Sequence, residues 1–196
     1  MALAESRRSS RGFSLVEVLF AMAILTTIAL GVAQTFAVAT RANADAKGQT
    51  STAILATQKM EQLRGLTWGL DTAGLGLPLS DTVTDLSVDP PTDRGTGLNP
   101  SPGGTLQSNI PPFVDYLDQY GNWVGNQSNP PPTAVYIRRW SIEPLPTNPN
   151  NTLIFQVMVT RVVTESIRLS GGVASSDRWR LRDDAWVVTA RTRKSK

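Results

Sequence analysis

The longest apolar run of the chain covers residues 13–39, and it is apolar on every side of a helix rather than along one stripe. No charged residue occurs between Val18 and Thr40. With a rise of about 1.5 Å per residue, a helix over this run is roughly 40 Å long, which exceeds the ~30 Å hydrocarbon core of a bilayer. The pattern therefore predicts a transmembrane helix.

Between residues 40 and 64 the pattern becomes one-sided. Small and apolar residues recur at steps of three and four, which is typical of a helix that buries one face. The predicted buried stripe contains Ala42, Ala46, Ala53, Ala56 or Thr57, Met60 and Leu63, and the charged residues expected mostly off it are Arg41, Asp45, Lys47, Lys59, Glu61 and Arg64. Gly65 is a typical C-terminal stop. We therefore expect one helix over residues 13–64, with a membrane half and an amphipathic half at 40–64.

Residues 65–133 hold ten of the 13 prolines and ten of the 15 glycines, so this region is predicted to be mostly loop. One hairpin is expected within it, over residues 113–124, with its turn near Tyr120 and Gly121.

Three strands are predicted in the C-terminal region 134–196, over residues 134–143, 153–164 and 179–192. Strands that follow one another through short loops favour an antiparallel sheet. Packed on the amphipathic half of the helix, this sheet gives an α+β fold with a long N-terminal helix.

Composition excludes several classes of chemistry. The 196 residues include no histidine and no cysteine, which removes disulfides, thiolate metal sites, thiol nucleophiles and the usual general base. Asp115 and Asp118, and the adjacent Asp183 and Asp184, could serve acid–base chemistry or bind calcium. Their spacing matches no known metal loop, so turn-forming and solvated carboxylates are the preferred interpretation. We expect no catalytic residue, no metal site and no cofactor.

Basic residues raise the question of nucleic acid. The net charge of +3 is too small to argue for it alone. Arg178, Arg180 and Arg182 alternate onto one face of the last predicted strand, and the basic tail contains Arg191, Arg193, Lys194 and Lys196. This set is compatible with contacts to DNA phosphates. A solvated strand face and a frayed tail are the preferred interpretation.

The N-terminal flank sets the topology of the apolar run. Arg7, Arg8 and Arg11 precede it, so the positive-inside rule leaves the N-terminus in the cytoplasm and the head outside. A cleaved secretory signal is the alternative, with a small-x-small site at residues 37–39. Because the apolar core of such signals is only about 7 to 15 residues long, a retained helix is favoured.

Glu17 is unexpected at the start of this run, because a charge near the bilayer core costs about 2 to 3 kcal/mol. The stretch GFSLVEVLFAM, residues 12–22, resembles the cleavage and methylation motif of type IV prepilins and pseudopilins. The resemblance implies that residues 1–12 are a leader peptide and that a prepilin peptidase cuts between Gly12 and Phe13. Phe13 would then be N-methylated, leaving 184 residues with a net charge of +1.

The resemblance also implies a role for Glu17. In a filament its carboxylate would pair with the N-terminal amine of a neighbouring subunit, lowering the desolvation cost of that amine and fixing the axial register of adjacent helices. A glutamate that reaches to the membrane interface is the alternative. A similarity to pilins implies the same architecture of helix and sheet.

Three features favour a minor subunit over the bulk filament subunit: no proline in the apolar run, no disulfide, and the long proline-rich region. We expect a non-enzymatic minor subunit of a type IV pilus or type II secretion pseudopilus, held in the bacterial inner membrane before assembly. Its expected partners are the prepilin peptidase, other pilins of the same filament and inner-membrane lipid. The alternative is a membrane-anchored or secreted extracytoplasmic binding protein that works alone, for example on DNA.

Overall fold

A computed structural model describes residues 12–71, 73, 75–170 and 184–193 of the chain. The chain divides into two units, Met1–Ala44 and Asp45–Lys196. Helix α1 runs from Leu15 to Gly65 without a break and contributes to both units. The expected helix over residues 13–64 is therefore confirmed to within two residues at each end. Its apolar part is long and hydrophobic enough to cross a membrane, as judged by length and composition.

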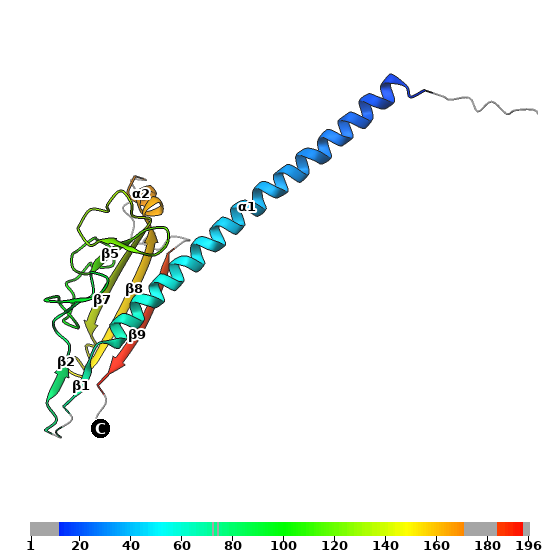
Figure 1. The fold of residues 1–196 in the computed structure, drawn as a ribbon. Helices are drawn as coiled ribbons and strands as arrows, with labels where there is room; N and C mark the ends of the chain where they lie inside the picture. Colours follow the sequence, from blue (N-terminus) through cyan, green and yellow to red (C-terminus); the bar gives the residue numbers. More distant parts are fainter. Residues whose placement is uncertain (1–11, 72, 74, 171–183, 194–196) are drawn as a thin grey trace, which may run out of the picture. The chain divides into compact units, whose positions relative to one another are not determined.

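The second unit is built around a five-stranded antiparallel sheet with the strand order β6-β5-β7-β8-β9 (Figure 1). Its strands are β5 (Val114–Leu117), β6 (Trp123–Gly125), β7 (Tyr136–Pro144), β8 (Thr152–Arg161) and β9 (Ala185–Thr192). Two small two-stranded sheets precede it, formed by β1 (Trp68–Leu70) with β2 (Pro78–Ser80) and by β3 (Thr84–Asp85) with β4 (Thr92–Asp93). Helix α2 (Val162–Ser170) follows β8. This α+β arrangement of a long helix and an antiparallel sheet is pilin-like, as expected.

The hairpin predicted in the proline-rich region is present and belongs to the main sheet. The amide of Asp118 donates to the carbonyl of Asn122 over 2.9 Å, and Gly121 closes the turn with a φ of 85°, which favours glycine. Strand β5 then pairs with β7, Asp115 opposite Arg138. The sheet therefore draws two of its strands from residues 65–133.

Strand β8 ends earlier than the sequence indicated. A strand to Thr164 was expected, but β8 stops at Arg161 and α2 begins at Val162. Arg161 pairs with Tyr136, the first residue of β7, and the described part of β9 reaches only to Val159 of β8. No described strand pairs with the chain beyond Arg161, whose backbone groups are bonded mainly within a helix instead.

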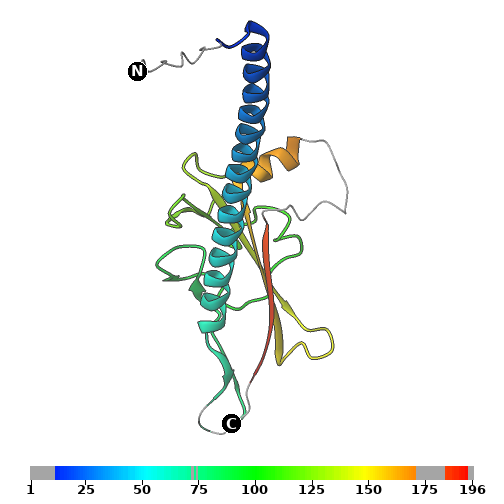
Figure 2. The same cartoon turned by 90° about the vertical axis from the view of Figure 1, so that its right-hand side faces the viewer.

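The second half of α1 covers one face of this sheet (Figure 2). The helix side chains buried there are Gly48, Thr52, Leu55, Ala56, Lys59, Met60 and Leu63. From the predicted stripe, Ala56, Met60 and Leu63 are confirmed, but Ala42, Ala46 and Ala53 are exposed. The helical period was correct and the predicted buried face was displaced around the helix, because alanines were counted as apolar and Lys59 as solvated.

The opposite face of the sheet carries a smaller apolar cluster and a strap of loop. Val114, Tyr116 and Ile137 form the cluster. The strap, residues 98–108, begins at Leu98 in the core on the helix side. Ser101 then binds the free edge of β7: its amide donates to the carbonyl of Ile142 over 2.9 Å, and its Oγ accepts from the Ile142 amide over 3.0 Å. The strap thereby reaches the opposite face.

Candidate functional site

The N-terminal end of α1 holds the residues singled out by the sequence. Ser14 caps the helix, since its Oγ accepts from the amide of Val16 at 3.4 Å. Glu17 is the third residue of the helix and lies in its first turn, where a negative charge interacts favourably with the helix dipole. Phe13, Glu17 and Ala21 border the same shallow hollow on the helix surface. The side chain of Glu17 is thus on the same side as the residue whose amine processing would free.

The apolar half of α1 is uncovered within its own unit. Phe13 and the large apolar side chains of this half are exposed by 47% (Val18) to 82% (Phe13), and the most apolar 18-residue window of the helix has no buried residue. The hydroxyls of Thr26, Thr27 and Thr35 donate to carbonyls four residues earlier, at 2.7 to 2.9 Å. Because these polar groups are satisfied within the helix, they do not oppose burial in lipid or against other helices.

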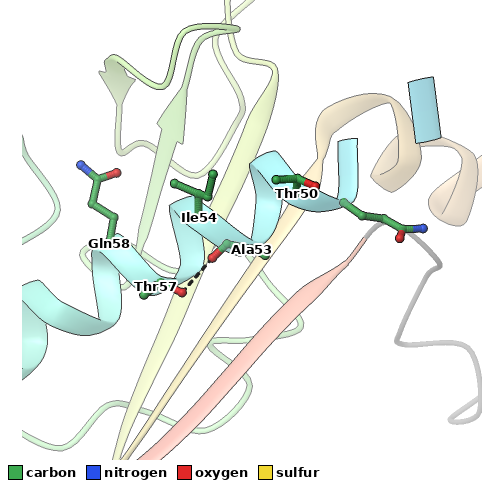
Figure 3. A pocket seen from close by; sticks show the side chains of 6 residues that line it. Thr50, Ala53, Ile54, Thr57 and Gln58 are labelled. Atoms are coloured by element: carbon green, nitrogen blue, oxygen red, sulfur yellow. Dashed lines mark hydrogen bonds between the residues drawn. The ribbon is translucent and has the colours of Figure 1, made fainter. Parts of the chain in front are cut away.

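The outward face of the second half of α1 is also uncovered within its own unit. Figure 3 shows Thr50, Ala53, Ile54, Thr57 and Gln58 along this face. The Thr57 hydroxyl donates to the carbonyl of Ala53 at 3.0 Å, and Ile54 is 62% exposed. Short side chains leave a hollow beside Ile54, a surface that another helix could approach closely.

A buried ionic cluster joins the inward face of α1 to the sheet. Asp115 on β5 accepts two parallel bonds from Arg138 on β7, each 2.8 Å long. Lys59 of α1 lies 2.8 Å from the same carboxylate and donates to the carbonyl of Leu86. Its ammonium group also lies 4.4 Å from the ring centre of Trp140, a cation–π contact. The side chains of the three charged residues are each 1% exposed.

The cluster contains two cations and one carboxylate. Burial lowers the pKa of Lys59 to about 8, against the opposing attraction of Asp115. The cluster thus binds the helix to the β5–β7 pair with charge-assisted hydrogen bonds. Removing its shared carboxylate would leave two buried cations facing each other.

This cluster corrects two expectations from the sequence. Lys59 was expected mostly off the buried stripe and Asp115 was expected to be solvated, yet both are buried. Asp118, in contrast, is a turn residue as expected. Its carboxylate accepts from Asn122 and from the amide of Tyr120, and these bonds, led by that of the Asn122 side chain, lower its pKa.

A second buried pair lies on the opposite face of the sheet. Arg139 donates to Glu165 of α2 over 2.8 Å and to Asn109 over 2.9 Å. The pair attaches α2 to β7, although the two elements are not consecutive. Burial raises the pKa of the neighbouring Tyr116 to about 12.

The C-terminal arginines that the structure describes bind the protein itself. Arg191 donates to the carbonyls of Arg64 and Leu66, over 2.7 and 2.6 Å, where α1 ends. Arg193 donates to the carbonyl of Gly69, and its guanidinium stacks 3.5 Å from the ring centre of Trp68. Donors engaged in this way are poorly available to phosphates. Arg178, Arg180, Arg182, Lys194 and Lys196 lie outside the described residues.

Within residues 12–71, 73, 75–170 and 184–193, no group of three or more His, Cys, Asp or Glu side chains could hold a metal ion. Of the carboxylates that the sequence offered as candidates, Asp115 is an ion-pair partner and Asp118 orders a turn, whereas Asp183, next to Asp184, lies outside the described residues.

Comparison with known proteins adds one finding. Residues 7–33 match the family model of the prokaryotic N-terminal methylation motif. No curated protein and no solved structure matches the chain. The matched motif supports a type IV pilin-like protein of the prepilin type, processed for assembly into a pilus or pseudopilus. It points to a structural protein that is a prepilin peptidase substrate and assembles with other pilins. The motif and the apolar helix fit anchoring in the inner membrane with the head outside.

Proposed function

We propose that this protein is a minor subunit of a type IV pilus or of a type II secretion pseudopilus. The observation that carries the proposal is the methylation motif at residues 7–33, continued by an unbroken helix whose apolar half is uncovered within the chain. The leader would be residues 1–12, the assembly helix 13–39, the amphipathic half 40–64, the loop region 65–133 and the C-terminal part of the head 134–196.

Processing in this proposal occurs between Gly12 and Phe13, followed by N-methylation of Phe13. A Cβ added at Gly12 would meet no other atom within 4 Å, so the fold does not require glycine there. Access of a peptidase to the backbone beside the cut does provide a reason. Glu17 would then pair with the amine of a neighbouring subunit, which accounts for a carboxylate at the start of a membrane helix.

The decisive experiment measures the N-terminus of the mature chain by mass spectrometry, for wild type and for Gly12→Val. Wild type is expected to begin at N-methylated Phe13, and Gly12→Val is expected to accumulate as uncleaved precursor in the inner membrane. Gly31→Val is the matched control, because Gly31 also has no atom within 4 Å of its missing Cβ. This control should be processed normally.

Two results would overturn the processing step: wild-type levels of mature Gly12→Val protein, or a wild-type N-terminus near Thr40. The second result, or an intact leader on the wild-type protein, would support the alternative of a binding protein that works alone.

A further inference from the structure

A small polar pocket lies on the sheet face turned away from α1. Successive residues of a strand point to opposite faces, so Ser141 on β7 points away from Trp140 and Ile142, which pack in the core on the helix side. Gln156 on β8 is the cross-strand partner of Ser141, and Trp186 on β9 lies one strand further. The strap covers these positions with Thr105 and Gln107, and Glu143 completes the lining.

Two hydroxyls in this pocket have no partner in the part of the chain that the structure describes. Ser141 is 2% exposed and Thr105 is 1% exposed, and neither Oγ atom makes a hydrogen bond there. Burying a hydroxyl without a partner is costly, and most buried polar atoms in proteins are paired. Both residues line the pocket, so a molecule in the pocket could bind their hydroxyls.

The lining defines the chemistry of that molecule. The hydroxyls can donate or accept, the Gln156 amide can do both, and the Glu143 carboxylate accepts. The half-buried indole of Trp186 offers an apolar surface. The described residues that line the pocket include no lysine or arginine. The carboxylate in this described lining disfavours phosphate and other anions.

We propose that this pocket binds a neutral saccharide. A sugar presents hydroxyls that donate and accept along its edge and an apolar C–H face, which matches hydroxyls, amide and carboxylate grouped around an indole. The occupant is one sugar unit or the end of a longer glycan, because the pocket is small and local. This activity is independent of filament assembly and would remain in a protein that works alone.

The pocket wall is held in place before any ligand arrives. The strap is fixed to β7 by hydrogen bonds between Ser101 and Ile142. It turns at Gly104, whose φ of 83° favours glycine and whose carbonyl accepts from the amides of Gln107 and Ser108. Gln156 donates to Glu143 over 3.4 Å, which orients both side chains. A wall fixed in this way lowers the entropy cost of binding.

The test uses the full chain, purified in a detergent without a sugar head group. Saturation-transfer NMR is recorded with glucose, galactose, mannose, N-acetylglucosamine and their disaccharides. Wild type should show transfer from protein to at least one sugar. Ser141→Ala should weaken that binding about tenfold, since one hydrogen bond is lost. Its thermal stability should be unchanged or higher, because the deleted hydroxyl has no partner among the described residues. Trp186→Ala should abolish measurable transfer.

Thr160→Val is the matched control. Its Oγ is also buried without a partner in the described residues, but Thr160 does not line the pocket. This variant should bind sugar as wild type does. The proposal is overturned if no sugar in the panel shows transfer at millimolar concentration. It is also overturned if Ser141→Ala and Trp186→Ala both bind like wild type, or if Thr160→Val weakens binding as much as Ser141→Ala.

Discussion

In the first half of helix α1 large apolar side chains are uncovered, whereas in the second half a lysine is buried. Leu25 in the first half is 68% exposed, and Lys59 in the second half is 1% exposed. The inward face of the second half is covered within its own unit, because the ionic cluster and the sheet satisfy both its charge and its apolar surface. The first half is exposed within its own unit, and in our proposal it is buried by lipid and by neighbouring helices. One continuous helix therefore has an exposed apolar surface in its first half and a packed, core-facing surface in its second half.

The largest difference between the two halves of α1 is expected when the shared carboxylate of the ionic cluster is removed. Asp115→Ala leaves Lys59 and Arg138 buried without a counter-ion, which should cost about 3 to 5 kcal/mol of the free energy of unfolding of the head. Membrane insertion of the first half should be unaffected. The measurement is protease resistance of the head in isolated membranes, together with membrane fractionation.

Asp118→Ala is the control for this variant. Asp118 is only partly buried in its turn, so its replacement should reduce stability much less than that of Asp115. Equal losses in the two variants would contradict the buried cluster.

The proposed assembly role of the exposed first half of α1 is tested by Glu17→Ala. Insertion and cleavage should persist, because a charge is removed from the membrane and Gly12 and Phe13 are unchanged. Incorporation into filaments should fall by at least tenfold, since an unpaired buried amine costs more than about 1.4 kcal/mol. Immunoblots of sheared filaments give the measurement. Glu17→Gln keeps the shape but removes the charge and should be nearly as defective; normal incorporation of both variants would leave Glu17 as an interfacial glutamate only.

Alkaline pH should change the stability of the head through the buried Lys59 in the second half of α1. Burial lowers the pKa of Lys59 to about 8 from an ordinary 10.5. Between these values the unfolded chain holds a proton that the folded head has lost, so the free energy of unfolding should rise with pH across this window, by a few kcal/mol at most. Below pH 8 both states hold the proton and the effect of Lys59 is constant.

The opposing group is Tyr116, whose pKa is raised to about 12 by burial. The folded head keeps its proton longer than the unfolded chain does, so this residue lowers stability as pH rises above 10. Denaturant titrations of the protein from pH 7 to 11 should therefore show a rise followed by a fall. Lys59→Met should remove the rise, and a rise that persists in this variant would assign it to another group.

The smallest expected effect is that of Ile54→Ala. Ile54 is 62% exposed on the face shown in Figure 3, so its loss should change the stability of the head by no more than about 0.5 kcal/mol. The adjacent Leu55→Ala removes a side chain that is 8% exposed and should cost about 2 to 5 kcal/mol. Thermal unfolding of both variants measures the contrast, and similar losses would mean that the face of Ile54 is covered.

Sequence patterns predicted the parts of this fold that depend on local chemistry. Helix α1 and strands β7, β8 and β9 were predicted from the periodicity of apolar residues and from the glycines and prolines that mark the ends of elements. The ionic cluster could not be predicted in this way, because Lys59, Asp115 and Arg138 lie far apart in the sequence and each, taken alone, is typical of a solvated surface. The buried face of α1 was displaced for the same reason, since Lys59 was counted as polar.

The saccharide pocket was missed on similar grounds. Ser141, Gln156 and Trp186 meet only through the pairing of three strands, and the strap adds Thr105 from a region predicted to be loop. The motif around Gly12, Phe13 and Glu17 is the opposite case, because it consists of residues close together in the sequence and can be recognised without knowledge of the fold.

The contacts of Arg191 with the end of α1 imply an order between synthesis of the chain and folding of the head. The carbonyls of Arg64 and Leu66, at and just after the end of α1, receive donors that the ribosome adds 127 and 125 residues later. Until those residues are made, the end of α1 lacks these donors and β8 lacks the neighbour that β9 provides. The head therefore completes its folding only after translation has passed Arg191 and, in the proposed membrane-anchored precursor, after that segment has joined the sheet outside the cytoplasm.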